Sequence, residues 1–345
     1  TTSSNAVRLI DIARKAGVSK MTVARVLHGS GGGKVRVSAK TAQRVEAIAR
    51  ELNYQANAVA QILAGGKSNT LGVIVDSHAP LTVFRTLRHI ERAAASRGYR
   101  IMIGETHDDP LGLVQSYRDL KRHGVDGVIC LSHDYPGCSD EHYRQLDGES
   151  GLVYLDKPPL GSAAYVVVGR DTGVRLAVEY LLEKGRKRIG MQLLDVHTLS
   201  SLQRLEGYRQ AIRDYAPKLD EMVDYVGRPK DAIQLKQVTI EIVKRFVIAK
   251  KLDAILAIND LWAGYLMAAM RAAGLRVPED VAVIGYDNEE MSDCLLPRLT
   301  SIDQNSEAQA VALVEQCLAQ IHDVAIDTTS WEGGILPRLV IRDSA

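Results

Sequence analysis

One short segment gathers residue types that can bind a metal ion. Residues 132–142 read SHDYPGCSDEH. The metal-ligating side chains in this segment are His133, Asp134, Cys138, Asp140 and His142. Zinc sites use these residue types, but at characteristic spacings that this segment does not match. We interpret it as a polar surface loop and expect no metal.

Two other segments come close to catalytic motifs without matching them. DGESG at residues 147–151 lacks one residue of the Gly-x-Ser-x-Gly pattern that presents a nucleophilic serine. In HGSGGGKVRV, residues 28–37, His28 stands where a phosphate-binding loop needs its first glycine, and Val35 where it needs the hydroxyl that ligates Mg²⁺. We therefore expect no enzyme activity, no catalytic residue and no cofactor.

The chemistry that remains is non-covalent binding, and a short basic helix is its first example. Residues 17–27 read GVSKMTVARVL. Gly17 can adopt the left-handed conformation that ends one helix, and Ser19 can cap the next one. At helical spacing, one face of that next helix collects Lys20, Met21, Ala24, Arg25 and His28. Such a short, basic, hydrogen-bonding face is what a recognition helix presents to the DNA major groove.

Two further helices are expected to hold the basic helix in place. Residues 9–16 carry apolar side chains at positions i, i+3, i+4 and i+7, which predicts a helix before the turn. Val18 lies where the two helices would cross. A third helix would begin after the N-cap Ser38. Its core side chains would be Val45, Ile48, Ala49 and Leu52. We predict a helix-turn-helix headpiece over residues 1–56.

A short segment follows the headpiece at residues 57–69. Asn57 can cap a helix over residues 58–64, and Gly65–Gly66 would end it. Seven residues are too few for a stable helix in water. The segment is therefore either a plain linker or a hinge helix that folds on a partner. Leu63 favours the second reading, because minor-groove binders insert such side chains between base steps.

The distribution of charge indicates a polyanionic partner for the head. Residues 1–67 contain eleven Lys and Arg against three Asp and Glu, while the rest of the chain contains 32 against 39. A basic head on an acidic body is typical of a protein whose head meets nucleic acid.

Other features of the composition favour a cytoplasmic protein. The four cysteines form no CxxC pair, which fits free thiols in a reducing compartment. No apolar run approaches the roughly 20 residues of a membrane span. The first fifteen residues lack the apolar core of a secretion signal. We expect cytoplasmic localisation and no membrane partner.

Beyond residue 70 the pattern is that of parallel α/β units. Short apolar runs alternate with helical patterns such as residues 85–96 and 174–184. The runs lie at residues 71–75, 101–103, 127–131, 152–155, 165–168, 253–258 and 281–284. This alternation predicts an α/β fold with parallel sheets, behind an all-α headpiece.

A series of longer motifs runs through the chain. It opens with LIDIARKAGVSKMTVARVLHGS, VSAKTAQRVEAIARELNYQANAVAQILAG and TLGVIVD. It continues with RHGVDGVICL, RLAVEYLLEKGRKRIG, RLEGYRQAI, DAILAINDLWAGYLMAAMRAAGLRVPEDVAVIGYDN, PRLTSID and LPRLVIRDS. In this order the motifs resemble the LacI/GalR family of bacterial transcriptional regulators.

The resemblance implies a helix-turn-helix headpiece, a hinge helix and a two-lobed, effector-binding and dimerising body over residues 70–345. That body would be similar to the type I periplasmic binding proteins. Lobe 1 is expected at about residues 70–168 and 304–330, and lobe 2 at about 169–300.

The resemblance also implies DNA contacts. The residues at the family's DNA-contacting positions are Ser19, Lys20, Met21, Thr22, Arg25, His28, Asn57 and Leu63. Lys20 and Met21 stand at the two positions most tied to operator choice. The chain departs from the family pattern at Arg8, Ala24, His28 and Ala56, and the loop after the second helix is longer. These departures concern individual contacts.

For the body, the resemblance implies an effector site between the lobes. Arg204 stands where the family reaches a ligand hydroxyl or carboxylate, and Asn259 and Asp287 follow apolar strands, where open α/β sheets bind ligands. The weaker candidates are Asp260, Gln304, Ser77, Asp108 and Asp171. The alternatives are a surface ion pair for Arg204 and helix caps for the residues that follow strands. Trp262 is either a stacking platform for a sugar or, more in keeping with its helix, a core residue.

One segment departs from the family in the body. VVGRDTG, residues 167–173, has Gly169–Arg170 where the family has Asp-Asn. Asp171 substitutes for them, or the ligand is of a different type, such as an acidic one.

We therefore expect a homodimeric repressor that binds a pseudo-palindromic double-stranded DNA operator under the control of a small polar effector, a sugar or sugar acid. The chain ends soon after LPRLVIRDS, which favours a dimer over a tetramer. An activator or a co-repressor-dependent regulator shares every motif. A solute-binding protein is a third alternative, but it would not need the basic head.

Overall fold

The computed structural model describes residues 7–28, 37–54, 67–77, 79–107, 109–132, 140–195, 198–325 and 334–345. The chain divides into two compact units. One comprises residues 1–70 with 124–126, and the other comprises residues 71–123 and 127–345. None of the helices in the described ranges combines the length and the apolar character that a bilayer span requires.

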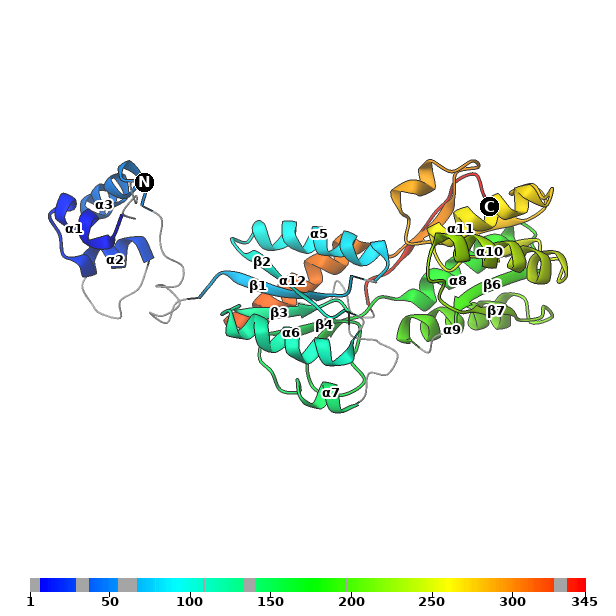
Figure 1. Cartoon of the computed structure of the whole chain (residues 1–345), viewed down its shortest axis with the longest axis horizontal. Coiled ribbons are helices and arrows are strands. Elements are labelled where there is room, and N and C mark those ends of the chain that lie inside the picture. The colour runs from blue at the N-terminus through cyan, green and yellow to red at the C-terminus, as the bar shows by residue number, and fades with distance from the viewer. Residues whose placement is uncertain are drawn as a thin grey trace. The chain divides into compact units, whose positions relative to one another are not determined.

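The described part of the headpiece contains three helices (Figure 1). Its helices are α1 (Leu9–Ala16), α2 (Lys20–His28) and α3 (Ala39–Glu51). Gly17 ends α1 in the left-handed conformation with φ 62°, as the sequence predicted. Ser19 accepts the Thr22 N–H at 3.1 Å, and Ser38 accepts the Thr41 N–H at 3.2 Å. These two caps fix where α2 and α3 begin.

A small apolar core holds the three helices together. Ile12 of α1, Val23 of α2 and Val45 of α3 are fully buried against one another. Val18 and Val26 pack around them. Because the apolar side of α2 is used in this core, its polar side faces outward.

The first lobe of the body is built on a five-stranded sheet in the order β2-β1-β3-β4-β5. The strands are β1 (Thr70–Val75), β2 (Arg100–Glu105), β3 (Gly127–Cys130), β4 (Leu152–Leu155) and β5 (Ala164–Val166). The pairs β1–β3, β3–β4 and β4–β5 are parallel. Parallel strands need crossovers, and helices supply them.

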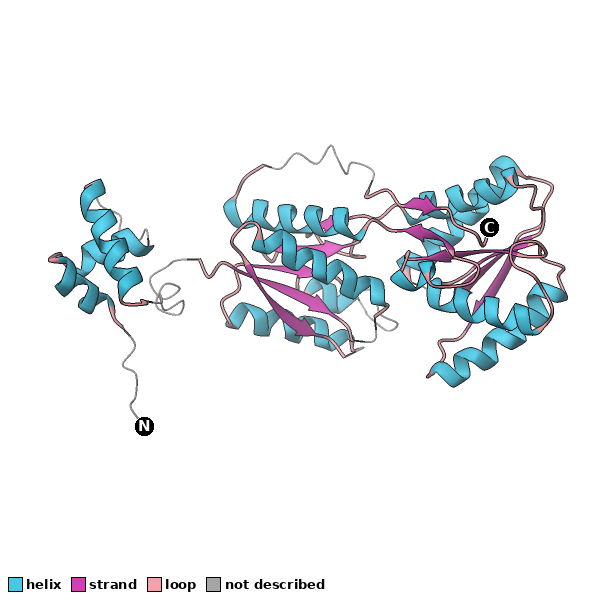
Figure 2. Ribbon diagram, turned by 90° about the horizontal axis from the view of Figure 1, so that it is seen from above, coloured by secondary structure: helices cyan, strands magenta, loops and turns pink. Residues whose placement is uncertain are grey.

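Helices cover both faces of this sheet (Figures 1 and 2). They are α5 (Leu81–Ala95), α6 (Pro110–Arg122), the short α7 (Asp140–Arg144) and α12 (Ser306–His322). Although α12 comes late in the sequence, its Leu313 and Val314 are buried with Ile90 of α5 in the core of this lobe. The chain therefore leaves the first lobe after β5 and returns to it.

The second lobe is built on a six-stranded sheet in the order β11-β10-β9-β8-β6-β7. The strands are β6 (Ile189–Leu194), β7 (Met222–Val226), β8 (Ala254–Leu256), β9 (Ala282–Tyr286), β10 (Thr300–Asp303) and β11 (Arg338–Val340). All neighbours are parallel except β11, which pairs antiparallel with β10.

Two separate apolar cores lie on the two faces of this sheet. One face carries α8 (Arg170–Glu183) and α9 (Leu199–Tyr215). The other carries α10 (Ala232–Ile242), the π-helix η1 (Val243–Ile248) and α11 (Asp260–Ala272). The 3-10 helix η2 (Glu290–Asp293) follows β9.

The structure adds to the sequence-based expectation in several places. Four strands were not predicted, namely β6, β7, β10 and β11, because polar residues interrupt their apolar runs. β2 was predicted but is an edge strand that exposes Met102 and Ile103. β10 extends the second lobe to Asp303, beyond the expected limit of 300. Trp262 is a core residue, 5% exposed, and forms no platform.

Candidate DNA-binding face and effector site

The outward face of α2 begins with exposed residues. Lys20 is exposed, and Met21 has 70% of its surface accessible. The hydroxyls of Ser19 and Thr22 lie 2.9 Å apart and hold each other at the start of the helix. A basic and a flexible side chain are thus presented from a rigid first turn.

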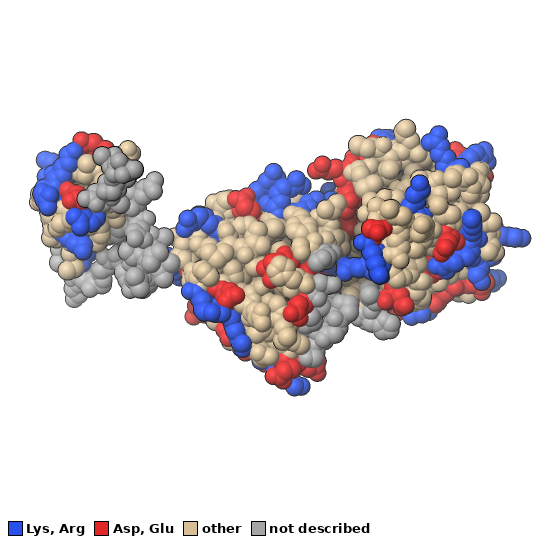
Figure 3. All heavy atoms as spheres, in the orientation of Figure 1, with Lys and Arg blue, Asp and Glu red and all other residues tan. Residues whose placement is uncertain are grey.

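The remaining DNA candidates differ in how they are placed. Arg25 lies one turn further along α2 and is partly buried. His28 is the last residue of α2. Asn57 and Leu63 lie outside the described residues. On the face of the headpiece drawn in Figure 3, Lys and Arg side chains outnumber Asp and Glu, in line with the basic composition of the head.

In the body, Arg204 is buried within the second lobe, with 8% of its surface exposed. From α9 its Nη2 donates to the carbonyl oxygens of Ala257, at 3.2 Å, and Ile258, at 2.7 Å, just after β8. Its guanidinium lies 3.9 Å from the ring centroid of Tyr286, the last residue of β9. The surface ion pair, the alternative for Arg204, is therefore wrong.

The environment of Arg204 is electrostatically unusual. Burial lowers the pKa of its guanidinium, Tyr286 and Asp287 partly offset this, and Arg170 adds to the lowering. Nε has no hydrogen-bond partner in the described part of the chain. No carboxylate of the described residues lies within 4.0 Å of the guanidinium nitrogens, so the charge is held by carbonyl dipoles and an aromatic face.

Asp287 and Gln304 form a buried pair beside it. Gln304 Nε2 donates to Asp287 Oδ1 at 2.6 Å, and both residues are less than a tenth exposed. Burial raises the pKa of Asp287, against the hydrogen bond from Gln304 and the charges of Arg204, Arg85 and Arg170. Asp287 has φ 99°, so a strained turn after β9 aims its side chain.

A residue outside the predicted set links this turn to the first lobe. Arg85 of α5 donates to the carbonyl oxygen of Asp287 and, at 2.7 Å, to that of Asn288. Arg85 Nε also lies 3.4 Å from Ser306 Oγ at the start of α12. No motif marks Arg85, since its partners are backbone atoms some 200 positions away.

A second unselected pair spans the lobes at the other crossover. Arg170, in the first turn of α8, forms a two-pronged ion pair with Asp156, which follows β4, with N–O distances of 2.7 Å. Arg170 Nη1 also lies 3.1 Å from Gln203 Oε1 on α9. Burial works against the charge of Arg170, but Asp156 leaves its pKa raised. In the sequence, the only indication of this pair was that Gly169–Arg170 replaces the Asp-Asn of the family pattern.

The structure shows the burial and the contacts of four other predicted effector residues. Asp260 is fully buried, and its oxygens accept from Ser301 Oγ, Glu289 N and Ser292 Oγ at 2.5–2.8 Å. It therefore holds η2 and β10 together and has no oxygen free for a ligand. Asn259 caps α11 through the Trp262 N–H at 3.1 Å.

Ser77 is exposed, and its backbone N–H donates to Glu105. Asp171 is partly buried in the first turn of α8. Asp108 lies outside the described residues. Arg204, Asp287 and Gln304 are thus the predicted residues that the fold brings together, and Arg170, Asp156, Tyr286 and Arg85 join them.

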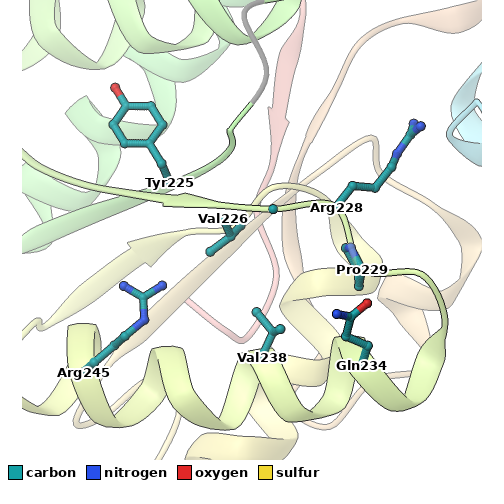
Figure 4. A pocket seen from close by; sticks show the side chains of 8 residues that line it. Tyr225, Val226, Arg228, Pro229, Gln234, Val238 and Arg245 are labelled. Carbon is teal, nitrogen blue, oxygen red and sulfur yellow. The ribbon is translucent and has the colours of Figure 1, made fainter. Parts of the chain in front are cut away.

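A separate surface pocket of about 250 Å³ lies where β7 meets α10 (Figure 4). Its lining includes Arg228 and Arg245, which lie at opposite ends and do not converge (Figure 4). Arg245 is moreover paired with Asp224, with Nη2–Oδ2 at 2.9 Å. None of the predicted effector residues lines this pocket.

Metal-binding groups do not cluster in the described ranges, where no three His, Cys, Asp or Glu side chains are arranged to hold an ion. Most of the suspected loop, including His133, Asp134 and Cys138, falls outside these ranges. Cys130, Cys294 and Cys317 are not in disulfides.

Comparison with protein families gives two matches in the order that the structure shows. The family described as "Bacterial regulatory proteins, lacI family" matches residues 8–57. The family described as "Periplasmic binding protein-like domain" matches residues 178–345.

The similar proteins are regulators over nearly their whole lengths. The transcriptional regulator GntR of Pseudomonas aeruginosa is 31% identical over 334 residues, 92% of each chain. The transcriptional repressor PurR of Vibrio atlanticus is 28% identical over 321 residues, 91% of each chain.

Solved structures confirm the fold class. The Lac repressor dimer bound to operator and the anti-inducer ONPF superposes with a TM-score of 0.82 at 26% identity, over 99% of each chain. The transcriptional regulator CelR in complex with cellobiose gives a TM-score of 0.66 at 25% identity, over 98% of this chain and all of the other.

Proposed function

The chain belongs to the lacI family of bacterial regulatory proteins, and from this premise we propose how its two units regulate transcription. It is a DNA-binding transcriptional regulator, and its relatives include proteins named as repressors. We assign repression to it as well. The body would bind the small molecule that controls the headpiece, in the cytoplasm, without enzymatic chemistry of its own.

The headpiece, residues 1–56, would enter the major groove with α2. The observation that carries this proposal is the first turn of α2, where Lys20 and Met21 are exposed on a helix whose other side is fixed by Val23. Ser19, Thr22, Arg25 and His28 would supply backbone and base contacts, and the segment 57–69 with Asn57 and Leu63 would act in the minor groove.

A homodimer is the assembly we propose, as in the Lac repressor dimer. A two-fold dimer presents the same surface to each half-site, so its operator is pseudo-palindromic. Because Lys and Arg neutralise phosphates, the affinity should fall steeply as salt rises.

The effector site would lie between the lobes, around Arg204, Asp287 and Gln304. Polar groups reach this region from both lobes: Asp156 and Arg85 from the first, and Arg170 and Arg204 from the second. A sugar or sugar acid would bind the cluster through several fixed donors and acceptors. Asn259, Asp171, Ser77 and Asp108 stay as peripheral candidates.

Control of DNA binding would follow from the position of this site. A ligand that binds better to one arrangement of the lobes shifts the population toward it. If that arrangement also favours one state of the hinge, effector and operator change each other's affinity by the same factor.

The test of this function is selection of operator DNA by the full-length protein from a random double-stranded library. The expected result is one enriched, inverted-repeat sequence, bound as a complex with two protein chains. Enrichment of no sequence, or of a half-site bound by one chain, would contradict the proposal. The enriched duplex then serves as the probe for effector screening.

A further inference from the structure

The inference starts from a buried positive charge. Arg204 is 8% exposed and is bound by two neutral carbonyl oxygens, and its Nε has no partner among the described residues. A buried charge without a counter-charge is costly, because carbonyl dipoles replace only part of its hydration. An arrangement that keeps such a charge is expected to bind something negative.

A second cation lies in the same electrostatic neighbourhood. Arg170 is 6% exposed, and its Nη1 lies 3.1 Å from Oε1 of Gln203, the residue before Arg204 on α9. Its charge lowers the pKa of Arg204 by repulsion. Arg170 is neutralised by Asp156, which belongs to the first lobe. In this structure the first lobe thus supplies a carboxylate that satisfies one of the two arginines, and the other has none within 4.0 Å in the described part of the chain.

A third group adds a donor. The ring of Tyr286 lies against the Arg204 guanidinium, and its buried hydroxyl has no hydrogen-bond partner among the residues that the structure describes. Burial raises the pKa of Tyr286 to about 12, so the hydroxyl keeps its proton near neutral pH. It can therefore donate a hydrogen bond to an anionic oxygen.

Resting on the proposed effector-binding role of the body, we propose that the effector carries a carboxylate or phosphate group that binds Arg204 and Arg170 and replaces Asp156 on Arg170. A planar guanidinium binds either group through two parallel hydrogen bonds. Neutral hydroxyls alone would leave Arg204 with no anionic group of the described residues within 4.0 Å, and with only the more distant charge of Asp287 to offset its own.

The exchange also connects binding to the arrangement of the lobes. Asp156 holds the first lobe to Arg170 of the second through a two-pronged contact. When an effector oxyanion takes its place, this tie is released and the ligand becomes the bridge. An anionic group therefore distinguishes two lobe arrangements, which is the condition for it to shift their equilibrium.

The experiment measures anion-dependent thermal stability of the full-length protein at constant ionic strength. Sodium chloride is replaced stepwise by sodium acetate in one arm and by sodium phosphate in the other, so that the two anion types are separated. We expect a saturable rise in Tm of about 1–3 °C in at least one arm. Phosphate also stabilises proteins non-specifically, so variants must carry the conclusion.

Three variants and a matched control decide it. Arg204→Met should lose the saturable rise, and Arg204→Lys should keep part of it. Arg209→Gln is the control, since Arg209 lies on the same helix in an exposed ion pair with Glu221. Asp156→Asn removes the competitor for Arg170, so it should lower the apparent Kd for the anion at least 3-fold even though it lowers the basal Tm. If the ion pair only stabilised the fold, Asp156→Asn would lower the basal Tm without tightening anion binding.

The inference is overturned if wild type shows no saturable rise, if Arg204→Met keeps it, or if Asp156→Asn weakens it. Should Arg204→Met not fold, Arg204→Lys takes its place: a reduced rise is the expected result, and a rise equal to that of wild type overturns the inference. Asp156→Asn is judged as before. The proposed function fails separately, if no operator is selected or if no ligand changes operator affinity. Stabilisation by the neutral sugars cellobiose or glucose, with no anion effect, would reject the inference and leave the proposed function standing.

Discussion

The guanidinium of Arg85 on α5 donates to the backbone carbonyl oxygen of Asp287, at the end of β9 in the other lobe. A second bond, at 2.7 Å, reaches the carbonyl of Asn288. The turn that carries Asp287 into the candidate effector site is therefore held by a side chain of the opposite lobe. The orientation of the Asp287 side chain therefore depends on how the two lobes are arranged.

Arg85→Met should weaken that dependence. Loss of two hydrogen bonds from a charged donor should lower the free energy of unfolding by about 1–3 kcal/mol, since the partly buried carbonyls are left without it. Urea unfolding of the full-length protein measures this. Arg88→Met is the control. Arg88 lies on the same helix, but it is half exposed and its ion pair with Glu290 is long, at 4.0 Å. Equal losses in both variants would contradict the assigned role of Arg85.

Lys20→Ala should reduce operator affinity. Lys20 is exposed at the start of α2, and a lost base or phosphate contact costs about 1–3 kcal/mol, or roughly 5- to 150-fold in Kd. Fluorescence anisotropy with the selected operator measures the change. Lys15→Ala removes the same charge from the headpiece, but Lys15 is bound to Glu51 at 2.5 Å and should matter less. If the two variants bind alike, α2 is not the recognition helix.

Asp260 should make stability depend on pH. Burial raises the pKa of Asp260 to about 7, above its ordinary value of 3.8. The folded state therefore holds a proton that the unfolded state has released, and stability falls as pH rises between about 4 and 7. This single group contributes a slope of up to about 1.4 kcal/mol per pH unit.

The test of this titration is urea unfolding of wild type and Asp260→Asn between pH 5 and pH 8. The variant should show a shallower decline, although the raised pKa values of Asp287 and Glu289 will preserve some of it. Asp280→Asn is the control, because Asp280 has a pKa lowered to about 2 and does not titrate in this range. Parallel curves for Asp260→Asn and wild type would contradict the assignment.

Gly207→Ala should disturb the effector site from a distance. A Cβ at this position on α9 would lie 2.6 Å from Asp171 Cα on α8, and closer to its carbonyl oxygen. Overpacking of this kind costs about 1–3 kcal/mol and would separate the helices that carry Arg204 and Arg170. A lower Tm and a weaker effector response are expected, with operator binding retained. Gly227→Ala, which meets no atom within 4 Å, should leave both unchanged.

The sequence by itself determined the headpiece. Its helices, turn and caps depend on residues less than five positions apart, such as Ser19 with Thr22 and Ser38 with Thr41. Local hydrogen bonding and helical periodicity therefore predicted the outward face of α2. The same holds for the alternation of apolar runs and helices that predicted an α/β body. Arg204, Asp287 and Gln304 were selected through the resemblance of motifs.

Only the tertiary structure decided which polar groups meet. Asp260 follows a strand, as ligand-binding residues do, but Ser301 of β10, Ser292 of η2 and the N–H just before η2 donate to it and leave no oxygen free. Arg85 stands in an ordinary helix and finds its partners some 200 residues away. In the sequence, Arg170 is only a departure from the family's Asp-Asn pattern, whereas in the fold it forms an ion pair with Asp156. Burial and charge pairing are properties of the folded lobes, and no local pattern along the chain records them.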